Sequence, residues 1–161
     1  MLTLDKKLKI GIIGLGYVGL PLAIEFGKKI DVYGYDKDPN RINQLISGFD
    51  ITKETTKIDL ENAKLLKFVD KVESLKSCNI YIVTVPTPID NNKKPDLSAI
   101  ISASETVGQI LDKNNVVIYE STVYPGCTEE ICVPILEKFS GLKYNKTFFC
   151  GYSPERINPG D

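Results

Sequence analysis

The feature that most constrains the fold is a glycine-rich motif between residues 9 and 25, KIGIIGLGYVGLPLAIE. An apolar run closes on Gly14, and two further glycines, Gly16 and Gly19, precede residues that favour helix. This order predicts a strand over 9–13, a tight turn and a helix to about Lys28. The spacing suits a dinucleotide pyrophosphate, because one glycine makes the turn, one admits the phosphates and one lets the helix pack closely on the strand.

The context of the motif supports dinucleotide binding. Glycines recur in many turns, so the spacing alone is weak evidence. A dinucleotide fold also needs an acidic residue about 20 positions further on, at the end of the second strand, to bind the adenosine ribose. Asp36 follows Val32-Tyr33-Gly34-Tyr35 and lies 22 residues after Gly14 (36 − 14). The N–H groups of the first helical turn would then face the anion.

Composition limits the class of partner. The chain has 161 residues, of which 42% are hydrophobic and 25% charged, and its formal net charge is −1. These values are ordinary for one globular domain. The basic residues form no stripe, so neither nucleic acid nor an anionic membrane surface is indicated. We expect the partner to be a small molecule.

The lysines that precede the first apolar run give it a superficial likeness to a signal peptide. Glycines and Pro21 break this run, no A-x-A-like cleavage site follows, and Glu25 interrupts it before it reaches membrane-spanning length. We therefore expect a cytoplasmic protein that does not bind membranes.

Four cysteines and the absence of histidine limit the chemistry. Cys78, Cys127, Cys132 and Cys150 form no C-x-x-C pair, and no histidine can complete a typical zinc set. We expect reduced, mostly buried thiols and no metal site. On an α-helix, residues five apart differ by about 140°, so Cys127 and Cys132 should lie on different faces. Without histidine, acid–base chemistry in this chain must use carboxylates, lysine, tyrosine or water.

Strand-like and helix-like segments alternate along the chain, which is typical of a parallel sheet with crossover helices. We expect an α/β fold, a Rossmann-type doubly wound parallel sheet of about six strands with helices on both faces. The predicted strands are 9–13, a second ending at Asp36, 67–69, 79–85, 116–119 and 147–150. Further predicted helices are 39–46, a short one near 59–65, one that Asp96 caps, and one that opens at Thr128 and that Pro134 should kink or shorten.

Polar loops follow the fourth, fifth and sixth predicted strands. Ligands of open α/β sheets bind at the carboxyl edge of the strands, so these loops should converge on the glycine motif. Each loop also has a purely structural explanation, as a strand terminator, a helix-capping turn or a surface loop. Because the loops share the carboxyl edge of the sheet, we favour a role at the ligand site for four of their residues: Thr87, Ser121, Thr122 and Glu155.

Four segments occur together in this order: GLGYVGLPLA at 14–23, VTVPTP at 83–88, ESTV at 120–123 and SPER at 153–156. Together they resemble the UDP-glucose/GDP-mannose dehydrogenase family over the whole chain. The resemblance also accounts for Pro21, which family members carry. The longer signatures ESTVYPG and SPERINPGD are most similar to the branch that acts on UDP-N-acetylglucosamine or UDP-N-acetylgalactosamine. That branch typically supplies aminouronic acids to surface polysaccharides.

The resemblance implies an enzyme that oxidises the C6 alcohol of a UDP-sugar to a carboxylate with two NAD⁺, through a thioester on a cysteine. Family members are considerably longer than this chain, and a central helical region and a C-terminal UDP-sugar-binding domain hold the catalytic Cys and a Lys. None of the four cysteines here matches that nucleophile's motif. We therefore expect residues 1–161 to be the NAD-binding domain alone, inactive by itself, of an enzyme that is a homodimer or larger.

The resemblance assigns residues to the cofactor. The glycine loop contributes Gly14, Gly16, Tyr17, Val18 and Gly19. Asp36 binds the adenosine ribose and Arg41 lies beside the adenosine end. Thr87, Ser121 and Thr122 line the nicotinamide side.

The resemblance also assigns residues to catalysis and to the UDP-sugar. Thr122 is similar to a threonine that positions a catalytic water. Glu155 is similar to a glutamate that acts in thioester hydrolysis and contacts the substrate, and Arg156 belongs to the same substrate-binding segment. A carboxylate beside a bound water can act as a general base when its pKa suits the operating pH.

Two other functions stay open at this point. A non-catalytic NAD(H)-sensing module would need the glycine loop and Asp36, but not the loops at 121–122 and 153–155. An unrelated, complete small reductase is disfavoured because no proton-donor set such as Tyr-x-x-x-Lys is evident.

Overall fold

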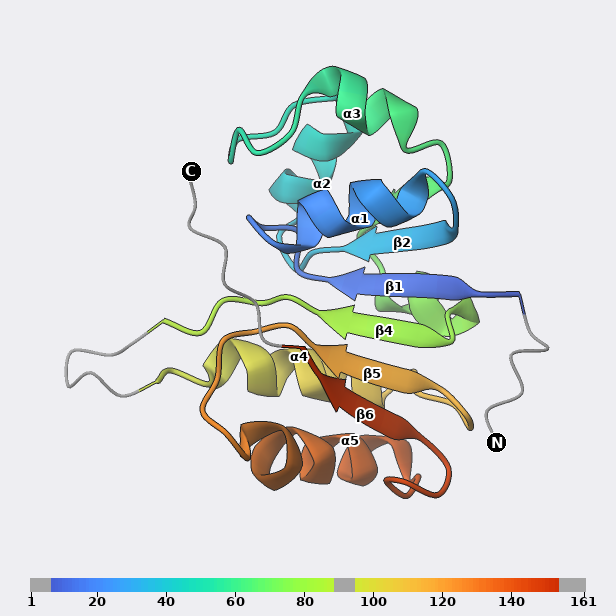
Figure 1. The fold of residues 1–161 in the computed structure, drawn as a ribbon, viewed down its shortest axis with the longest axis vertical. Helices are drawn as coiled ribbons and strands as arrows, with labels where there is room; N and C mark the ends of the chain where they lie inside the picture. The colour runs from blue at the N-terminus through green and yellow to red at the C-terminus, as the bar shows by residue number, and fades with distance from the viewer. Residues whose placement is uncertain (1–6, 89–94, 154–161) are drawn as a thin grey trace.

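The computed structural model describes residues 7–88 and 95–153, which form one parallel sheet between two layers of helices (Figure 1). All five strand pairings are parallel, and the strand order is β3-β2-β1-β4-β5-β6. This is the order of a dinucleotide-binding Rossmann sheet, so the expected fold class is confirmed. The strands are β1 (Lys9–Ile13), β2 (Asp31–Tyr35), β3 (Leu66–Val69), β4 (Ile80–Val83), β5 (Val116–Tyr119) and β6 (Phe149–Tyr152).

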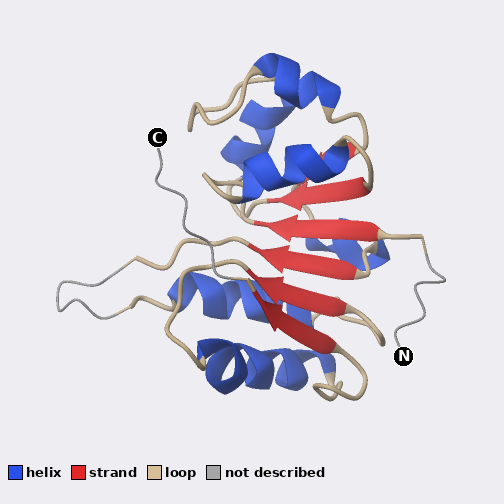
Figure 2. Cartoon of the chain, viewed as in Figure 1, coloured by secondary structure: helices blue, strands red, loops and turns tan. Residues whose placement is uncertain are grey.

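Helices connect the strands and cover both faces of the sheet (Figure 2). No helix within the described ranges has the length and apolar character needed to cross a bilayer. The α-helices are α1 (Gly19–Gly27), α2 (Pro39–Ile46), α3 (Lys57–Asn62), α4 (Ser98–Gly108) and α5 (Val133–Ser140). A 3₁₀-helix, η1 (Val72–Ser77), precedes β4, and a π-helical turn, η2 (Thr128–Cys132), precedes α5.

Two apolar clusters fill the spaces between the sheet and its helices. Successive strand residues point to opposite faces, so the strands β1 to β5 supply both clusters. Ile12 of β1 packs in the cluster that holds Leu20 of α1. On the other face, Val83 of β4 packs with Ile100 of α4 and Leu136 of α5. The sheet is therefore buried on both sides, as the mainly apolar segment 79–85 indicates.

Several predicted elements agree with the structure and others are displaced. The strands Lys9–Ile13 and Val116–Tyr119 and the helix Pro39–Ile46 have the predicted bounds. The helix expected near 59–65 is Lys57–Asn62, because Thr56 and Asp59 form a capping box that fixes its start. The sixth strand is Phe149–Tyr152 rather than 147–150, because the residues before it form hydrogen-bonded turns closed by Lys143 O.

The helix expected after Asp96 is α4. Its N-cap position is held by Leu97, and Asp96 lies one residue earlier, where its Oδ1 accepts from Ser98 N at 2.9 Å. The apolar residues with helical spacing in and just after this helix are buried at Ile100, Val107, Ile110 and Leu111 and partly exposed at Leu97 and Ile101.

The prediction that Cys127 and Cys132 lie on different faces is wrong. It assumed an α-helix, whereas the Val133 N–H donates to Thr128 O, five residues earlier, in a π-helical turn. This wider turn places residues five apart on nearly the same side, and the two buried thiols lie close enough that Cys132 lowers the pKa of Cys127 and Cys127 raises that of Cys132. Pro134 is the second residue of α5, directly after this π-helical turn, and the regular α-helix begins at Val133 rather than at Thr128.

The thiols form no disulfides and have raised pKa values. Cys78, Cys127 and Cys132 are buried and Cys150 is half-buried, as expected. Burial raises the pKa of Cys78 and Cys150 to about 12 and that of Cys132 to about 11. Burial also raises the pKa of Cys127, against hydrogen bonds from its neighbours that lower it. The raised pKa values keep these thiols protonated at neutral pH. Because only the thiolate is a nucleophile, the cysteines are unreactive there.

Alkylation with iodoacetamide at pH 8 checks this conclusion. We expect the native chain to take up less than one carbamidomethyl group in the time in which the chain unfolded in guanidinium chloride modifies all four thiols. Mass spectrometry of the intact protein counts the groups. Rapid labelling of any single thiol in the native chain would show that its site is open or its pKa ordinary.

Candidate functional site

The candidate site lies at the carboxyl edge of the sheet, where the strand order reverses between β1 and β4. Two cavities, of about 380 and 370 Å³, open there. They share the glycine loop at Gly16 and the end of β4 at Thr84, Val85 and Pro86. In an open α/β sheet this reversal point is the expected place for a ligand.

The glycine loop is shaped by close packing. Gly14 has φ +97°, a backbone conformation that L side chains rarely adopt, and its N–H donates to Tyr35 O at 2.9 Å. A Cβ at Gly19 would lie 1.9 Å from Gly14 O, so no side chain fits there. A Cβ at Gly16 would meet no atom within 4 Å. Gly14 and Gly19 therefore serve the turn and the helix packing, while Gly16 leaves backbone open to the cavities.

Thr84 holds the glycine loop in place, and sequence analysis did not find it. Its buried hydroxyl donates to Gly14 O at 2.7 Å and lies 3.2 Å from Ile13 O. A Cβ at Gly19 would approach this hydroxyl to 2.4 Å. The available signal was a hydroxyl residue inside the otherwise apolar segment 79–85, since buried polar groups need partners.

Asp36 follows β2 and lines the larger cavity. Its Oδ2 accepts from Leu15 N at 2.9 Å and its Oδ1 from Asp38 N at 3.0 Å. A carboxylate offers about four acceptor sites, so about two stay available to a ligand. That is the number needed for the two hydroxyls of a ribose.

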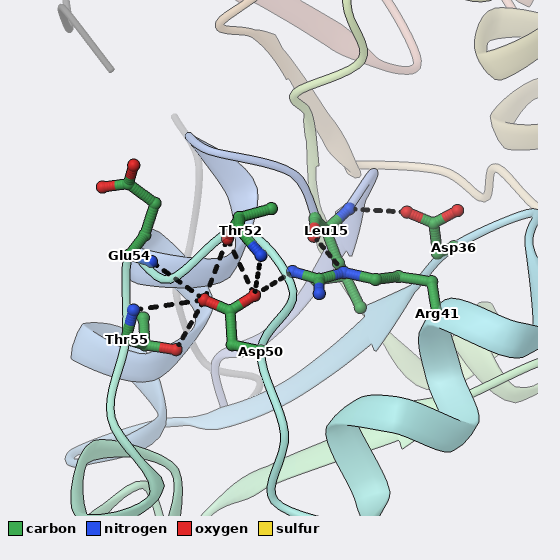
Figure 3. Close-up of polar contacts among 7 residues, drawn as sticks. All are labelled: Leu15, Asp36, Arg41, Asp50, Thr52, Glu54 and Thr55. Carbon is green, nitrogen blue, oxygen red and sulfur yellow. Dashed lines mark hydrogen bonds and ion pairs between the residues drawn. The ribbon is translucent and has the colours of Figure 1, made fainter. Parts of the chain in front are cut away.

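Arg41 of α2 is buried beside Asp36 and also lines this cavity (Figure 3). Its Nε donates to Leu15 O at 2.9 Å, and its Nη2 lies 2.8 Å from Asp50 Oδ1. Asp36 and Arg41 thus bind the N–H and the carbonyl of the same residue, Leu15. The beginning of the glycine loop is tied to β2 and α2 through these two contacts.

Asp50 organises the segment that follows α2, and sequence analysis did not single it out. Its carboxylate accepts from Thr52 N and Oγ1, from Glu54 N, and from Thr55 N and Oγ1, at 2.7 to 3.1 Å (Figure 3). Its side chain is fully buried. The segment 49–77 is polar and lacks a clear period, so the pattern gave no sign that one carboxylate fixes it.

The charge of Asp50 is stabilised by its partners. Burial alone would raise its pKa, but hydrogen bonds from Thr52 and the Arg41 guanidinium outweigh burial and hold the pKa below its ordinary value. A carboxyl with a lowered pKa in the folded state stabilises the fold above its unfolded pKa. This contribution is lost as the pH falls through the folded pKa.

The smaller cavity is built from the loops after β4 and β5 and from the glycine loop. Tyr17 and Val18 line it on one side, and Thr87, Ser121 and Thr122 on the other. The Ser121 hydroxyl donates to Val85 O at 2.6 Å, and the Thr87 hydroxyl donates to Thr122 O. The loops at 86–88 and 120–122 therefore converge as the sequence predicts.

Glu120 also lines the smaller cavity, although sequence analysis gave it no role. Glu155 and Arg156 lie outside the described residues. Within 7–88 and 95–153, no three His, Cys, Asp or Glu side chains gather as metal ligands would.

Residues 8–161 match the model for the NAD binding domain of the UDP-glucose/GDP-mannose dehydrogenase family. The chain belongs to this family. The match confirms the resemblance inferred from the four sequence segments, and it identifies the cofactor as NAD.

Relatives of the NAD-binding domain are enzymes of greater length. The chain is 59% identical over 155 residues to UDP-N-acetyl-D-glucosamine 6-dehydrogenase of Salmonella typhi, covering 96% of the chain and 36% of the relative. It is 58% identical over 156 residues to the enzyme of that name in Pseudomonas aeruginosa, covering 97% of the chain and 37% of the relative. The chain therefore spans little more than a third of either relative.

A solved structure has the same fold. The UDP-D-ManNAc dehydrogenase of Pyrococcus horikoshii superimposes with a TM-score of 0.87 at 38% identity, over 95% of this chain and 37% of that one. The described sheet and helices are therefore those of the family.

Substitution of the glycines separates their roles. We expect Gly19→Ala to lower the free energy of unfolding by about 1 to 3 kcal/mol or more, because a Cβ there overlaps backbone that cannot move freely. Gly16→Ala is the matched control and should change stability by less than about 0.5 kcal/mol, because its Cβ enters open space. Urea unfolding followed by circular dichroism measures both. Equal stabilities would contradict the packing described for Gly19.

Proposed function

We propose that residues 1–161 are the NAD-binding domain of a UDP-N-acetylhexosamine 6-dehydrogenase, or of a UDP-glucose-type one. The whole enzyme would oxidise the C6 alcohol of the sugar to a carboxylate with two NAD⁺, for surface polysaccharide biosynthesis. The observation that carries the proposal is the pair of cavities that meet at the glycine loop. The identity of nearly 60% with two UDP-N-acetyl-D-glucosamine 6-dehydrogenases supports the substrate class.

The larger cavity is the proposed adenosine side. Asp36 would accept the ribose hydroxyls with the acceptor capacity that Leu15 N and Asp38 N leave free. Arg41 would lie beside the adenosine, held by Leu15 O. The pyrophosphate would cross the open backbone at Gly16 and face the first turn of α1, whose N–H groups favour an anion.

The smaller cavity is the proposed nicotinamide side, with Tyr17, Val18, Thr87, Ser121 and Thr122 around it. NAD⁺ supplies the hydride acceptor. Thr122 is exposed at the mouth of this cavity, where its hydroxyl can hold a water.

The remaining assignments concern residues outside the described ranges and the whole enzyme. We assign Glu155 as the general base of thioester hydrolysis, and Glu155 with Arg156 as contacts to the UDP-sugar. The family resemblance supports these roles. It also supports a cytoplasmic enzyme that forms a homodimer or larger oligomer.

The second cavity favours an enzyme over an NAD(H)-sensing module. A sensor needs only the part of the site that binds the adenosine and the pyrophosphate. Here the loops after β4 and β5 are joined by the hydroxyls of Ser121 and Thr87, and they enclose a space of about 370 Å³ beyond the glycine loop. Hydride transfer requires such an enclosed cavity, in which the nicotinamide and the reacting part of the substrate can meet.

Calorimetric titration of the isolated chain tests the adenosine assignment. We expect NAD⁺ to bind more tightly than NADP⁺, because Asp36 accepts the ribose hydroxyls and repels a 2′-phosphate. Asp36→Asn removes that repulsion and should narrow the difference. Equal or tighter binding of NADP⁺ by the unmodified chain would show that Asp36 does not face the ribose.

Absorbance of NADH tests whether this chain turns over substrate. With NAD⁺ and UDP-N-acetylglucosamine we expect no sustained NADH production, because no cysteine lines either cavity and burial keeps the thiols protonated. The longer enzyme of Pseudomonas aeruginosa, assayed in parallel, shows that the substrate and assay are sound. Steady NADH formation by the 161-residue chain would mean that it contains a complete active site.

A further inference from the structure

We propose that Asp50 determines the preference of this site for NAD⁺, by holding Arg41 in an ion pair that keeps it from receiving a 2′-phosphate. The inference rests on the proposed placement of the adenosine ribose at Asp36. Asp50 is a positioning residue here, since it acts through Arg41. Nothing in its sequence context suggests this role.

Arg41 is the cation best placed to bind a 2′-phosphate. It lies in the first turn of α2, directly after the strand whose end carries Asp36, and it lines the same cavity. In Rossmann domains an arginine near this carboxylate accommodates the additional phosphate of NADP. Its Nη1 and Nη2 are both buried and neither makes a hydrogen bond among the described residues, so the contact of Nη2 with Asp50 is an ion pair and Nη1 has no partner there. Without some restraint, this guanidinium would be a phosphate receptor.

Asp50 supplies the restraint. Its Oδ1 lies 2.8 Å from Arg41 Nη2, and the Asp50 side chain is wholly buried while that of Arg41 is 9% exposed. The carboxylate cannot follow a moving arginine, because backbone N–H groups of Thr52, Glu54 and Thr55 hold it (Figure 3). If Arg41 turned to a phosphate, Asp50 would become an unpaired buried charge, which is strongly unfavourable.

A second contact fixes the arginine from the other side. Its Nε donates to Leu15 O at 2.9 Å, within the glycine loop. The guanidinium is therefore anchored at two points, and its charge is balanced by a carboxylate on the side away from Asp36 (Figure 3). A 2′-phosphate would meet the repulsion of Asp36 without a free cation to offset it.

The exposed charges at the rim of the cavity do not replace Arg41. Lys37 and Asp38 both line it and both are exposed. Adjacent opposite charges largely cancel, and water screens an exposed ammonium, so such contacts are worth little. The buried pair of Arg41 and Asp50 is therefore the charge arrangement that determines the preference for NAD⁺ over NADP⁺.

The experiment is Asp50→Asn in the 161-residue chain, titrated calorimetrically with NAD⁺ and NADP⁺. The substitution removes the negative charge and leaves Arg41 able to pair with the 2′-phosphate. We expect the ratio of the NADP⁺ to the NAD⁺ dissociation constant to fall by about 10- to 100-fold, the range for a hydrogen bond to a charged group. Each titration is preceded by circular dichroism to establish that the variant is folded.

Two variants serve as controls. Asp59→Asn removes another carboxylate that is hydrogen-bonded to a threonine, Thr56, in the same part of the chain but that does not pair with Arg41. It should leave the ratio within twofold of the unmodified chain. The double variant Arg41→Met with Asp50→Asn removes both charges, and we expect the gain for NADP⁺ to disappear.

The outcomes separate this inference from the proposed site. If Asp50→Asn is folded and its ratio is unchanged, Asp50 only organises its loop and the inference is wrong. If that variant does not fold, the double variant Arg41→Met with Asp50→Asn tests the inference instead. A ratio of the NADP⁺ to the NAD⁺ dissociation constant equal to that of the unmodified chain supports the inference, because Arg41 then contributes nothing to binding of the 2′-phosphate. A larger ratio contradicts the inference, because it shows that Arg41 of the unmodified chain already binds the phosphate. If the unmodified chain binds neither dinucleotide, the adenosine placement fails, and this inference fails with it.

Discussion

The site depends on the contact between the start of α1 and the ends of β1 and β4. At Gly19 the helix comes so close to Gly14 that a single added carbon would lie 1.9 Å from its carbonyl oxygen. The buried hydroxyl of Thr84 satisfies that same carbonyl at 2.7 Å. This contact points the first turn of α1 at the carboxyl edge of the sheet, and both cavities meet there. Without it the helix dipole and the open backbone at Gly16 would not face one ligand.

The charged residues at the adenosine side are linked in series through the backbone of Leu15. Asp36 binds the N–H of Leu15 and Arg41 binds its carbonyl, so the glycine loop is fixed between an anion and a cation. Asp50 then balances the buried arginine. Buried charges are tolerated only when paired and hydrogen-bonded. That requirement explains why a polar, irregular segment after α2 is held by so many bonds to one carboxylate.

The opposite side of the site is arranged through hydroxyl groups rather than charges. Ser121 and Thr87 each donate to a carbonyl of the neighbouring loop, which joins the ends of β4 and β5. Behind these loops, the π-helical turn brings Cys127 and Cys132 together in the core with raised pKa values. The cysteines serve packing, and the cavity is left to the exposed Thr122 and the half-buried Glu120.

The fold class, most strand positions, the glycine loop and the place of Asp36 could be predicted from the sequence, because these follow from local periodicity and from spacing along the chain. The sequence also indicated that the loops after β4 and β5 meet, since parallel strands end at one edge. The roles of Thr84 and Asp50 and the proximity of Cys127 and Cys132 could not be predicted and became evident only in the folded chain. The partners of Thr84 and Asp50 are brought together by packing between distant segments, and a π-turn cannot be distinguished from an α-helix by apolar spacing alone.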